Sequence, residues 1–457
     1  MSTICAVSTP LAQGGISVIR ISGENALTVA EKIFKPFGSK TIEQMPGHTC
    51  VYGRVINPND NRQIDDALLT VFRAPKSYTG EDTAEISCHG GVFVTKEVLR
   101  LCIDAGAKLA DKGEFTKRAF INGKLTLTQA ESVMDLISAQ GEQSLRSANL
   151  TREGRLFKEI SASAKELVHI LGELGAWVDY PEEDLPEVEV PALTSSIQSV
   201  LSTINRILSD YDSGMILRNG ADTVIAGKPN VGKSTLMNML LGYDRSIVTH
   251  IAGTTRDVIE ETARLGEITL KISDTAGIRK ADNPVEQVGV ELARKKIKGC
   301  DVVIAVFDSS KPLDDEDYEL LDYITKHDKR LLIVLNKSDL TCVLTPEQMA
   351  EYSQYCVVIS AKNNQGREDI VEKLSEIFSL GEFDPDSTIY ANERQKACAE
   401  TAKKQLELAL DALSMGDTLD AVTVTLDAAA NALLELTGEK ASDAVVNEVF
   451  SKFCVGK

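Results

Sequence analysis

Residues 221–235 read ADTVIAGKPNVGKST, an apolar run followed by a glycine-containing loop. The loop fits the pattern GxxxxGK[ST], with Gly227, Gly232, Lys233 and Ser234 at its fixed positions. Glycines there let backbone N–H groups wrap phosphate oxygens, a helix that follows adds positive potential, and the lysine reaches the outer phosphates. The serine hydroxyl suits Mg²⁺. The stretch therefore predicts a strand, a phosphate-binding loop and a helix, which together open an α/β domain.

Three more motifs follow, each at the end of an apolar run that predicts a strand. DTAG (274–277) supplies a carboxylate beside the metal and a glycine next to the outer phosphate. In NKSD (336–339), Asp339 can accept two hydrogen bonds from guanine that adenine cannot donate, and Asn336 suits the other edge of the base. SAK (360–362) can place a backbone N–H on the guanine carbonyl. Four motifs in this order predict a GTPase.

The residues expected to bind the nucleotide lie in and between these motifs. They are Asn230, Val231, Gly232, Lys233, Ser234, Thr235, Thr249, Thr254, Thr255, Asp274, Thr275, Ala276, Gly277, Asn336, Lys337, Asp339, Ser360, Ala361 and Lys362. Ile278 follows DTAG, where Ras-type GTPases place the glutamine that orients water, so another group must do so. Glu286 is the nearest candidate along the chain, and a solvated carboxylate on a switch helix is the alternative. Asn230 offers an oxygen to a monovalent cation that could replace an arginine finger.

The rest of the chain predicts helices on both sides of this α/β unit. Residues 1–120 mix short alternating runs with turns, which indicates an α+β unit. Helical periods then return, with apolar stripes at Leu156, Ile160, Ala164, Leu167, Leu171, Leu174 and Val178 and at Leu419, Val422, Leu426, Ala429, Leu433 and Leu436. Neither flanking segment alone contains another apolar surface that would bury its stripe. We expect them to pack together, which makes 217–380 an insertion in a helical domain formed by 121–216 and 381–457.

The composition limits the cellular compartments and the binding partners that the chain can be expected to have. The chain has 457 residues and a net charge of 49 − 68 = −19, so it does not bind nucleic acid through bulk electrostatics. No apolar run approaches the ~18 residues of a membrane span, and the N-terminus has no secretory signal pattern. Nine cysteines form no close pair. These features predict a reduced, cytoplasmic protein without a membrane span.

With these motifs, the interrupted helical flanks and the ending CVGK (454–457), the chain resembles the TrmE family of bacterial tRNA modification GTPases over its whole length. The family commonly has isoleucine where this ending has Val455. The resemblance implies a homodimer and a flavin-dependent, MnmG-like partner, in a heterotetramer or larger complex through which tRNA is met. Together they place an aminomethyl or carboxymethylaminomethyl group on C5 of the wobble uridine.

The resemblance also implies a potassium-dependent GTPase, activated when the G domains dimerise. Potassium would be bound by Asn230, Thr249, Ile251 and Thr254, and magnesium by Ser234 and Thr255. Glu286 matches the glutamate that orients the attacking water.

In the N-terminal domain, which also dimerises, the family binds 5-formyltetrahydrofolate or a related tetrahydrofolate. Arg20, Glu85, Lys124 and Lys457 match its contact positions, and Cys454 would lie near the one-carbon chemistry as a catalytic residue. A carboxylate suits the donor-rich pterin edge, and cations suit glutamyl or formyl oxygens. The alternative for Arg20 and Glu85 is an ordinary pair of charges on a strand surface.

Two other functions fit parts of the sequence. A ribosome-assembly or other RNA-related switch GTPase could carry the same nucleotide motifs, but we would expect a basic RNA-binding module, and the net charge of −19 argues against one. A folate-dependent one-carbon enzyme with a regulatory GTPase is the second. Analysis of tRNA nucleosides separates all three.

Overall fold

The computed structural model describes residues 2–38, 41–139, 141–179, 189–209, 211, 214–216, 220–242, 260–266, 268–273, 295–327, 329–378, 392–416 and 418–457. They divide into two compact units. The first comprises Met1–Met134, Thr151–Leu201 and Cys398–Lys457, and the second Asp135–Leu150 and Ser202–Ala397. The domain bounds expected from the sequence do not coincide with these divisions and stay predictions.

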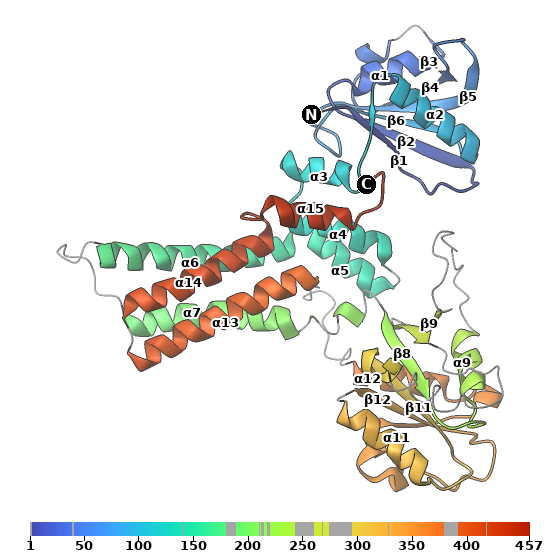
Figure 1. Ribbon diagram of the computed structural model, residues 1–457, viewed down its shortest axis with the longest axis vertical. Coiled ribbons are helices and arrows are strands. Elements are labelled where there is room, and N and C mark those ends of the chain that lie inside the picture. Colours follow the sequence, from blue (N-terminus) through green and yellow to red (C-terminus); the bar gives the residue numbers. More distant parts are fainter. Residues whose placement is uncertain are drawn as a thin grey trace. The chain divides into compact units, whose positions relative to one another are not determined.

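The N-terminal part of the first unit is built on a sheet whose strand order is β3-β4-β5-β6-β2-β1-β7 (Figure 1). Its strands are β1 (Ile4–Val7), β2 (Ile16–Ser22), β3 (Phe34–Pro36), β4 (Thr49–Ile56), β5 (Gln63–Phe72), β6 (Thr83–His89) and β7 (Lys108–Leu109). Every described pair is antiparallel except β1 with β7. Helices α1 (Ala26–Ile33) and α2 (Val92–Asp104) pack on the sheet, and a short 3-10 helix, η1 (Ile42–Gln44), packs against α1.

The two faces of this sheet differ because side chains alternate along each strand. Ile19 and Ile21 of β2 are fully buried in a core shared with α1 and α2. Arg20 between them points to the opposite face, where Glu85 of β6 is its neighbour in register. The alternation therefore brings a predicted pair of site residues onto one strand pair, on the face away from α1 and α2.

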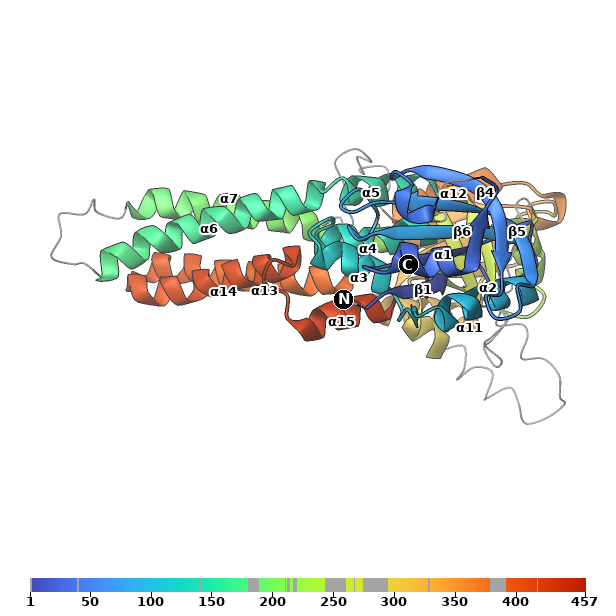
Figure 2. The ribbon, with the colours of Figure 1, turned by 90° about the horizontal axis from the view of Figure 1, so that it is seen from above.

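Helices make up most of the remaining first unit. Other helices before and after the α/β sheet in the chain are α3 (Glu114–Ile121), α4 (Leu127–Ser138), α5 (Glu142–Arg152), α6 (Arg155–Asp179), α7 (Val190–Ser209), α13 (Glu393–Met415), α14 (Leu419–Thr437) and α15 (Asp443–Ser451). Nearly all of α5 belongs to the second unit, and α4, α7 and α13 extend into it. Figure 2 shows α6, α7, α13 and α14 running side by side, and α6 packs against α14. The two predicted stripes are thus brought together, although residues before and after the α/β domain supply them.

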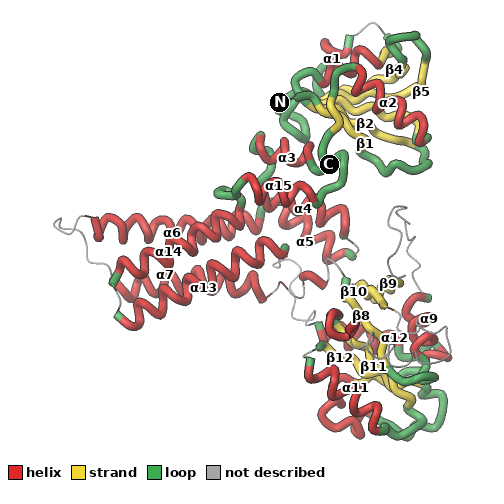
Figure 3. Tube along the Cα trace, viewed as in Figure 1, coloured by secondary structure: helices red, strands yellow, loops and turns green. Residues whose placement is uncertain are grey.

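The second unit contains a sheet of order β13-β12-β11-β8-β10-β9 (Figure 3). The strands are β8 (Ala221–Ala226), β9 (Glu260–Leu265), β10 (Ile268–Ser273), β11 (Val302–Asp308), β12 (Arg330–Asn336) and β13 (Cys356–Val358). The described pairs are parallel except β9 with β10. Helices α9 (Lys233–Leu241) and α12 (Arg367–Ile377) share one apolar core with the sheet, and α11 (Asp315–Lys326) and the 3-10 helix η3 (Pro346–Tyr355) share the other.

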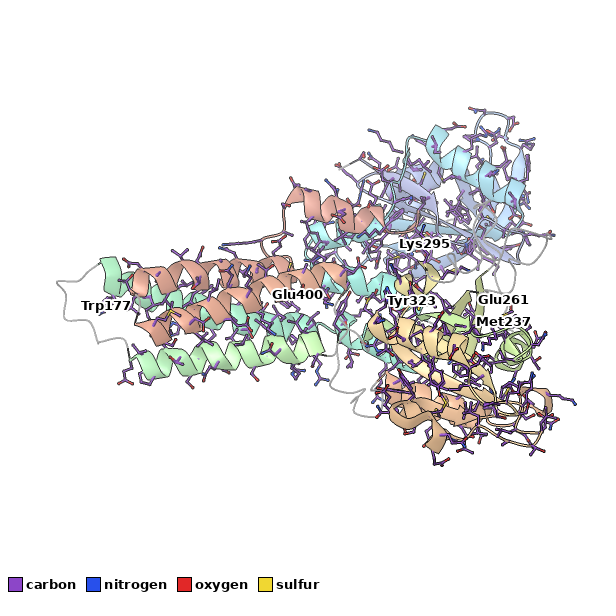
Figure 4. The ribbon with its side chains drawn as sticks, turned by 60° about the horizontal axis from the view of Figure 1, so that its bottom comes forward. Trp177, Met237, Glu261, Lys295, Tyr323 and Glu400 are labelled. Carbon is purple, nitrogen blue, oxygen red and sulfur yellow. The ribbon has the colours of Figure 1, made fainter. Side chains whose placement is uncertain are left out.

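The predicted fold class is confirmed: an α+β N-terminal part, a helical part and an inserted α/β domain with a mostly parallel sheet. Within the sheet of the α/β domain, strand β9 was not predicted from the sequence. It lies antiparallel at the sheet edge and packs against α9; Figure 4 labels Glu261 on β9 and Met237 on α9. Among the described helices, none combines the length and the apolar character that crossing a membrane requires.

Candidate functional site

The loop between β8 and α9 follows the backbone path that its glycines permit. Gly227 has φ 142° and Gly232, the N-cap of α9, has φ 103°. A Cβ on Gly227 would lie 2.4 Å from the carbonyl oxygen of Val306, and one on Gly232 would lie 2.2 Å from Asn336 Nδ2. A Cβ at Gly227 would strike the backbone, and one at Gly232 would force the Asn336 side chain to move, so both positions favour glycine.

Lys233 crosses the loop to which it belongs. Its Nζ donates hydrogen bonds of 2.6 Å to the carbonyl oxygens of Gly227 and Lys228. Ser234 and Thr235 are exposed on the first turn of α9, and Asn230 is exposed with φ 64°. The arrangement places one ammonium and two hydroxyl groups at a helix N-terminus, which is where phosphate and a metal ion bind in loops of this type.

Asn336 joins three motifs. Its Nδ2 donates to the carbonyl oxygen of Val231 at 2.9 Å, and its Oδ1 accepts from the Ala361 N–H at 3.0 Å. The Asn336 side chain is therefore bound by the protein at both ends, and its partner in the SAK motif is the Ala361 N–H. The contacts place the phosphate-binding loop, NKSD and SAK together at the carboxyl edge of the sheet.

Asp339 is oriented by a residue of the SAK motif. Ser360 Oγ donates a hydrogen bond of 2.8 Å to Asp339 Oδ1. Ser360 is fully buried and its Oγ also accepts from the Asn363 N–H, so its hydroxyl is fixed. The carboxylate that the sequence assigns to guanine thus has a defined orientation. Lys362, at the end of the motif, is exposed.

Several predicted residues lie outside the part of the chain that the structure describes. They are Thr249, Ile251, Thr254, Thr255, Asp274, Thr275, Ala276, Gly277 and Glu286. Among the described residues, no group of three or more His, Cys, Asp or Glu side chains is placed to hold a metal ion. Of the predicted metal ligands, only Asn230 and Ser234 can be located, and both belong to the phosphate-binding loop.

A second constellation lies on the face of the N-terminal sheet that points away from α1 and α2. Arg20 Nε donates a hydrogen bond of 2.7 Å to Glu85 Oε1. The Arg20 guanidinium carbon also lies 5.5 Å from the ring centroids of Tyr78 and of Phe115. A carboxylate, a guanidinium and two aromatic rings therefore meet in one place.

Lys124 reaches the same neighbourhood from the chain segment after α3. Its Nζ donates to the carbonyl oxygen of Pro75 at 3.0 Å. Pro75 lies in the same loop as Tyr78, whose hydroxyl lies 2.8 Å from Thr116 Oγ1 on α3. Burial raises the pKa of Tyr78 above its ordinary value, so the phenol is neutral at physiological pH.

The C-terminal tail is docked against this region through its backbone. The Gly113 N–H donates to the carbonyl oxygen of Cys454 at 3.3 Å, and the Phe115 N–H donates to Lys457 O at 3.2 Å. Ser8 Oγ donates to the carbonyl oxygen of Gly456 at 3.1 Å. The Cys454 side chain is exposed between these anchor points.

Some of these contact residues carried no signal in the sequence. Tyr78 lies in a stretch whose sequence indicates only a loop, and no sequence motif includes Phe115 or Ser8. Their importance comes from contacts with distant residues, for example Ser8 with Gly456.

Two family models cover the chain. Residues 3–124 match the model described as GTP-binding protein TrmE N-terminus, and residues 127–454 match the MnmE helical domain. A protein of Carboxydothermus hydrogenoformans named tRNA modification GTPase MnmE is 42% identical over 464 residues, covering 100% of this chain and 99% of the relative. A Lactobacillus acidophilus protein of the same name is 40% identical over 457 residues, covering 100% and 98%.

A crystal structure of Aquifex aeolicus Era is 26% identical to this chain and covers 41% of it and 67% of Era, with a TM-score of 0.27, which is too low to bear on the fold. The full-length relatives and the two family models agree with the motifs at the carboxyl edge of the α/β sheet. The resemblance inferred from the sequence is confirmed, and the chain belongs to the MnmE (TrmE) family of tRNA modification GTPases.

Proposed function

We propose that this chain hydrolyses GTP and uses the reaction in modifying the wobble uridine of tRNA. The observation that carries the GTPase part is the double contact of Asn336, which joins the phosphate-binding loop to SAK at the carboxyl edge of the sheet. Asp339, oriented by Ser360, reads guanine, and Lys233 and the N-terminus of α9 bind the phosphates. Family membership supports the tRNA part.

The residues of the phosphate-binding loop fit a magnesium and a potassium ion as far as they are described. Ser234 would hold Mg²⁺ together with Thr255, and Asn230 would hold K⁺ together with Thr249, Ile251 and Thr254. Both described side chains are exposed at the loop and present oxygen atoms, which are the ligands these ions prefer. The ions would supply positive charge beside the phosphates, and Glu286 would orient the attacking water.

The N-terminal constellation suits a tetrahydrofolate, and we propose 5-formyltetrahydrofolate or a relative as its ligand. Glu85 would accept from the pterin edge, while Arg20, Lys124 and Lys457 would face carboxylate or formyl oxygens. Contact of Arg20 with the partly exposed ring of Tyr78 supports the choice, because an aromatic ring beside a carboxylate matches a flat heterocycle that is rich in donors. Bound folate would supply the one-carbon unit, and Cys454 would act beside it.

The assembly that we propose is a homodimer working in the cytoplasm with an MnmG-like flavoprotein, which brings the tRNA. A net charge of −19 supports a partner protein as the carrier of tRNA. All nine cysteines are free thiols, which supports a reducing compartment.

Hydrolysis assays with the purified full-length protein test the proposal. We expect turnover of GTP but not of ATP, with a higher rate in KCl than in NaCl at equal ionic strength, because Asn230 provides an oxygen ligand for the larger ion. Equal rates in the two salts would refute the potassium site. Equal use of GTP and ATP would refute guanine recognition by Asp339.

A further inference from the structure

The end of strand β11 carries a carboxylate that belongs to none of the nucleotide motifs. Asp308 is the last residue of β11, and its side chain is 9% exposed. Its Oδ2 accepts a hydrogen bond of 2.6 Å from Lys337 Nζ. Its Oδ1 accepts from the Ser310 N–H at 3.1 Å and from Ser310 Oγ at 2.6 Å. Both oxygens are therefore engaged, one of them by the lysine of NKSD.

The contact between Asp308 and Lys337 is an ion pair at neutral pH. Burial raises the pKa of Asp308, but the hydrogen bonds from Lys337 and Ser310 outweigh it, and the pKa lies below its ordinary value. Charge-assisted hydrogen bonds of this kind are stronger than neutral ones. The Lys337 ammonium group is therefore held at Asp308, which restricts the conformations of the whole lysine side chain.

The backbone of Lys337 adds a second observation. Its φ is 69°, a left-handed conformation that is strained for a residue with a Cβ. Glycine would adopt this conformation with less strain. The presence of lysine there indicates that its side chain has a functional role. The residue after Asp308 also holds the residue before Lys337, because the Ser309 N–H donates to the carbonyl oxygen of Asn336 at 2.8 Å.

We propose that Asp308 is a positioning residue for guanine nucleotides, which fixes the Lys337 side chain beside the base-reading Asp339. The inference rests on the proposed function, since it takes NKSD as the loop that binds the base. A lysine already held in one orientation loses less side-chain entropy when the nucleotide binds, so the ion pair raises the affinity without touching the nucleotide.

The test is the substitution Asp308→Asn in the full-length protein. Asparagine keeps the shape and can still accept from Ser310, but it removes the charge that Lys337 pairs with. We expect the affinity for N-methylanthraniloyl-GDP, and for GTP in competition, to fall about tenfold, which corresponds to the side-chain entropy that an unrestrained lysine loses when it is ordered. The KM for GTP should rise with kcat unchanged, and the preference for guanine over xanthine should persist because Asp339 is intact.

Asp322→Asn is the matched control. Asp322 Oδ2 also lies 2.6 Å from a lysine Nζ, that of Lys326, but these side chains are 60% and 69% exposed on α11. Exposed pairs of this kind contribute little, so the nucleotide affinity should not change.

A double-mutant cycle with Lys337→Met separates positioning from a structural role. If Asp308 acts through Lys337, Asp308→Asn should cause no further loss of affinity in the Lys337→Met background. An equal loss in both backgrounds, or wild-type affinity in Asp308→Asn alone, would overturn this inference while leaving the GTPase proposal intact. A wild-type protein that bound no guanine nucleotide would overturn both.

Discussion

At the scale of single residues, the site depends on a glycine at which an added Cβ would displace a neighbouring side chain. Gly232 has φ 103°, and a Cβ there would lie 2.2 Å from Asn336 Nδ2, the atom that binds the carbonyl oxygen of Val231. Gly416 also has a positive φ, 76°, but a Cβ there would meet nothing within 4 Å. The two glycines therefore differ in crowding, while both favour a residue without a Cβ.

This difference predicts the outcome of two alanine substitutions. Gly232→Ala should lower the GTP affinity at least about tenfold, because Asn336 must move and the loop loses its contact with NKSD. Gly416→Ala should leave the affinity unchanged and should cost about 1 kcal/mol of stability through backbone strain alone. Titration with a fluorescent nucleotide measures the first effect and thermal unfolding the second. Wild-type affinity in Gly232→Ala would contradict the described loop contact.

Asp339 supports a prediction about base specificity. Asp339→Asn should exchange the preference for GTP for xanthosine triphosphate, because an amide can donate to the extra carbonyl of xanthine. Ser360 Oγ can still donate to the remaining oxygen, so the side chain keeps its orientation. Competition between the two nucleotides is the measurement. Unchanged guanine selectivity would mean that another group reads the base.

At the scale of elements, the sequence predicted those helices and strands whose apolar residues repeat with a local period. The apolar run before the phosphate-binding loop became β8, and the stripe from Leu156 became the buried side of α6. Strand β9 was missed because Ala263 and Leu265 are the only apolar residues in EETARL, too few to indicate alternation. The hydrogen bonds of Asn336 were not predictable either, because they join residues far apart in the sequence.

The packing of α6 against α14 supports a prediction with an internal control. Leu167 is fully buried, whereas its neighbour Val168 is 50% exposed. Leu167→Ala should lower the stability of the helical part by about 2–5 kcal/mol, the usual cost of a large-to-small change in a core. Val168→Ala should change it by less than about 0.5 kcal/mol. Hydrogen exchange at the amides of α6 measures both, and equal effects would contradict the orientation of the helix.

At the scale of the whole molecule, residues from distant parts of the chain make each site. The helical part combines segments on either side of the α/β domain, and the C-terminal tail docks beside Arg20 and Phe115 of the N-terminal part. The docking explains why a chain end can keep a defined place. Gly456 is buried, and a Cβ there would lie 2.2 Å from the carbonyl oxygen of Val7, while Cys454 stays exposed.

Analysis of the tRNA nucleosides in living cells tests the central claim most directly. Cells that lack this chain should lose the C5 group of the wobble uridine, and the wild-type chain should restore it. Cys454→Ser should fail to restore it while its purified form hydrolyses GTP at the wild-type rate, because serine keeps the size of the side chain but lacks thiolate reactivity. Unchanged wobble modification in cells without the chain would contradict the proposed function.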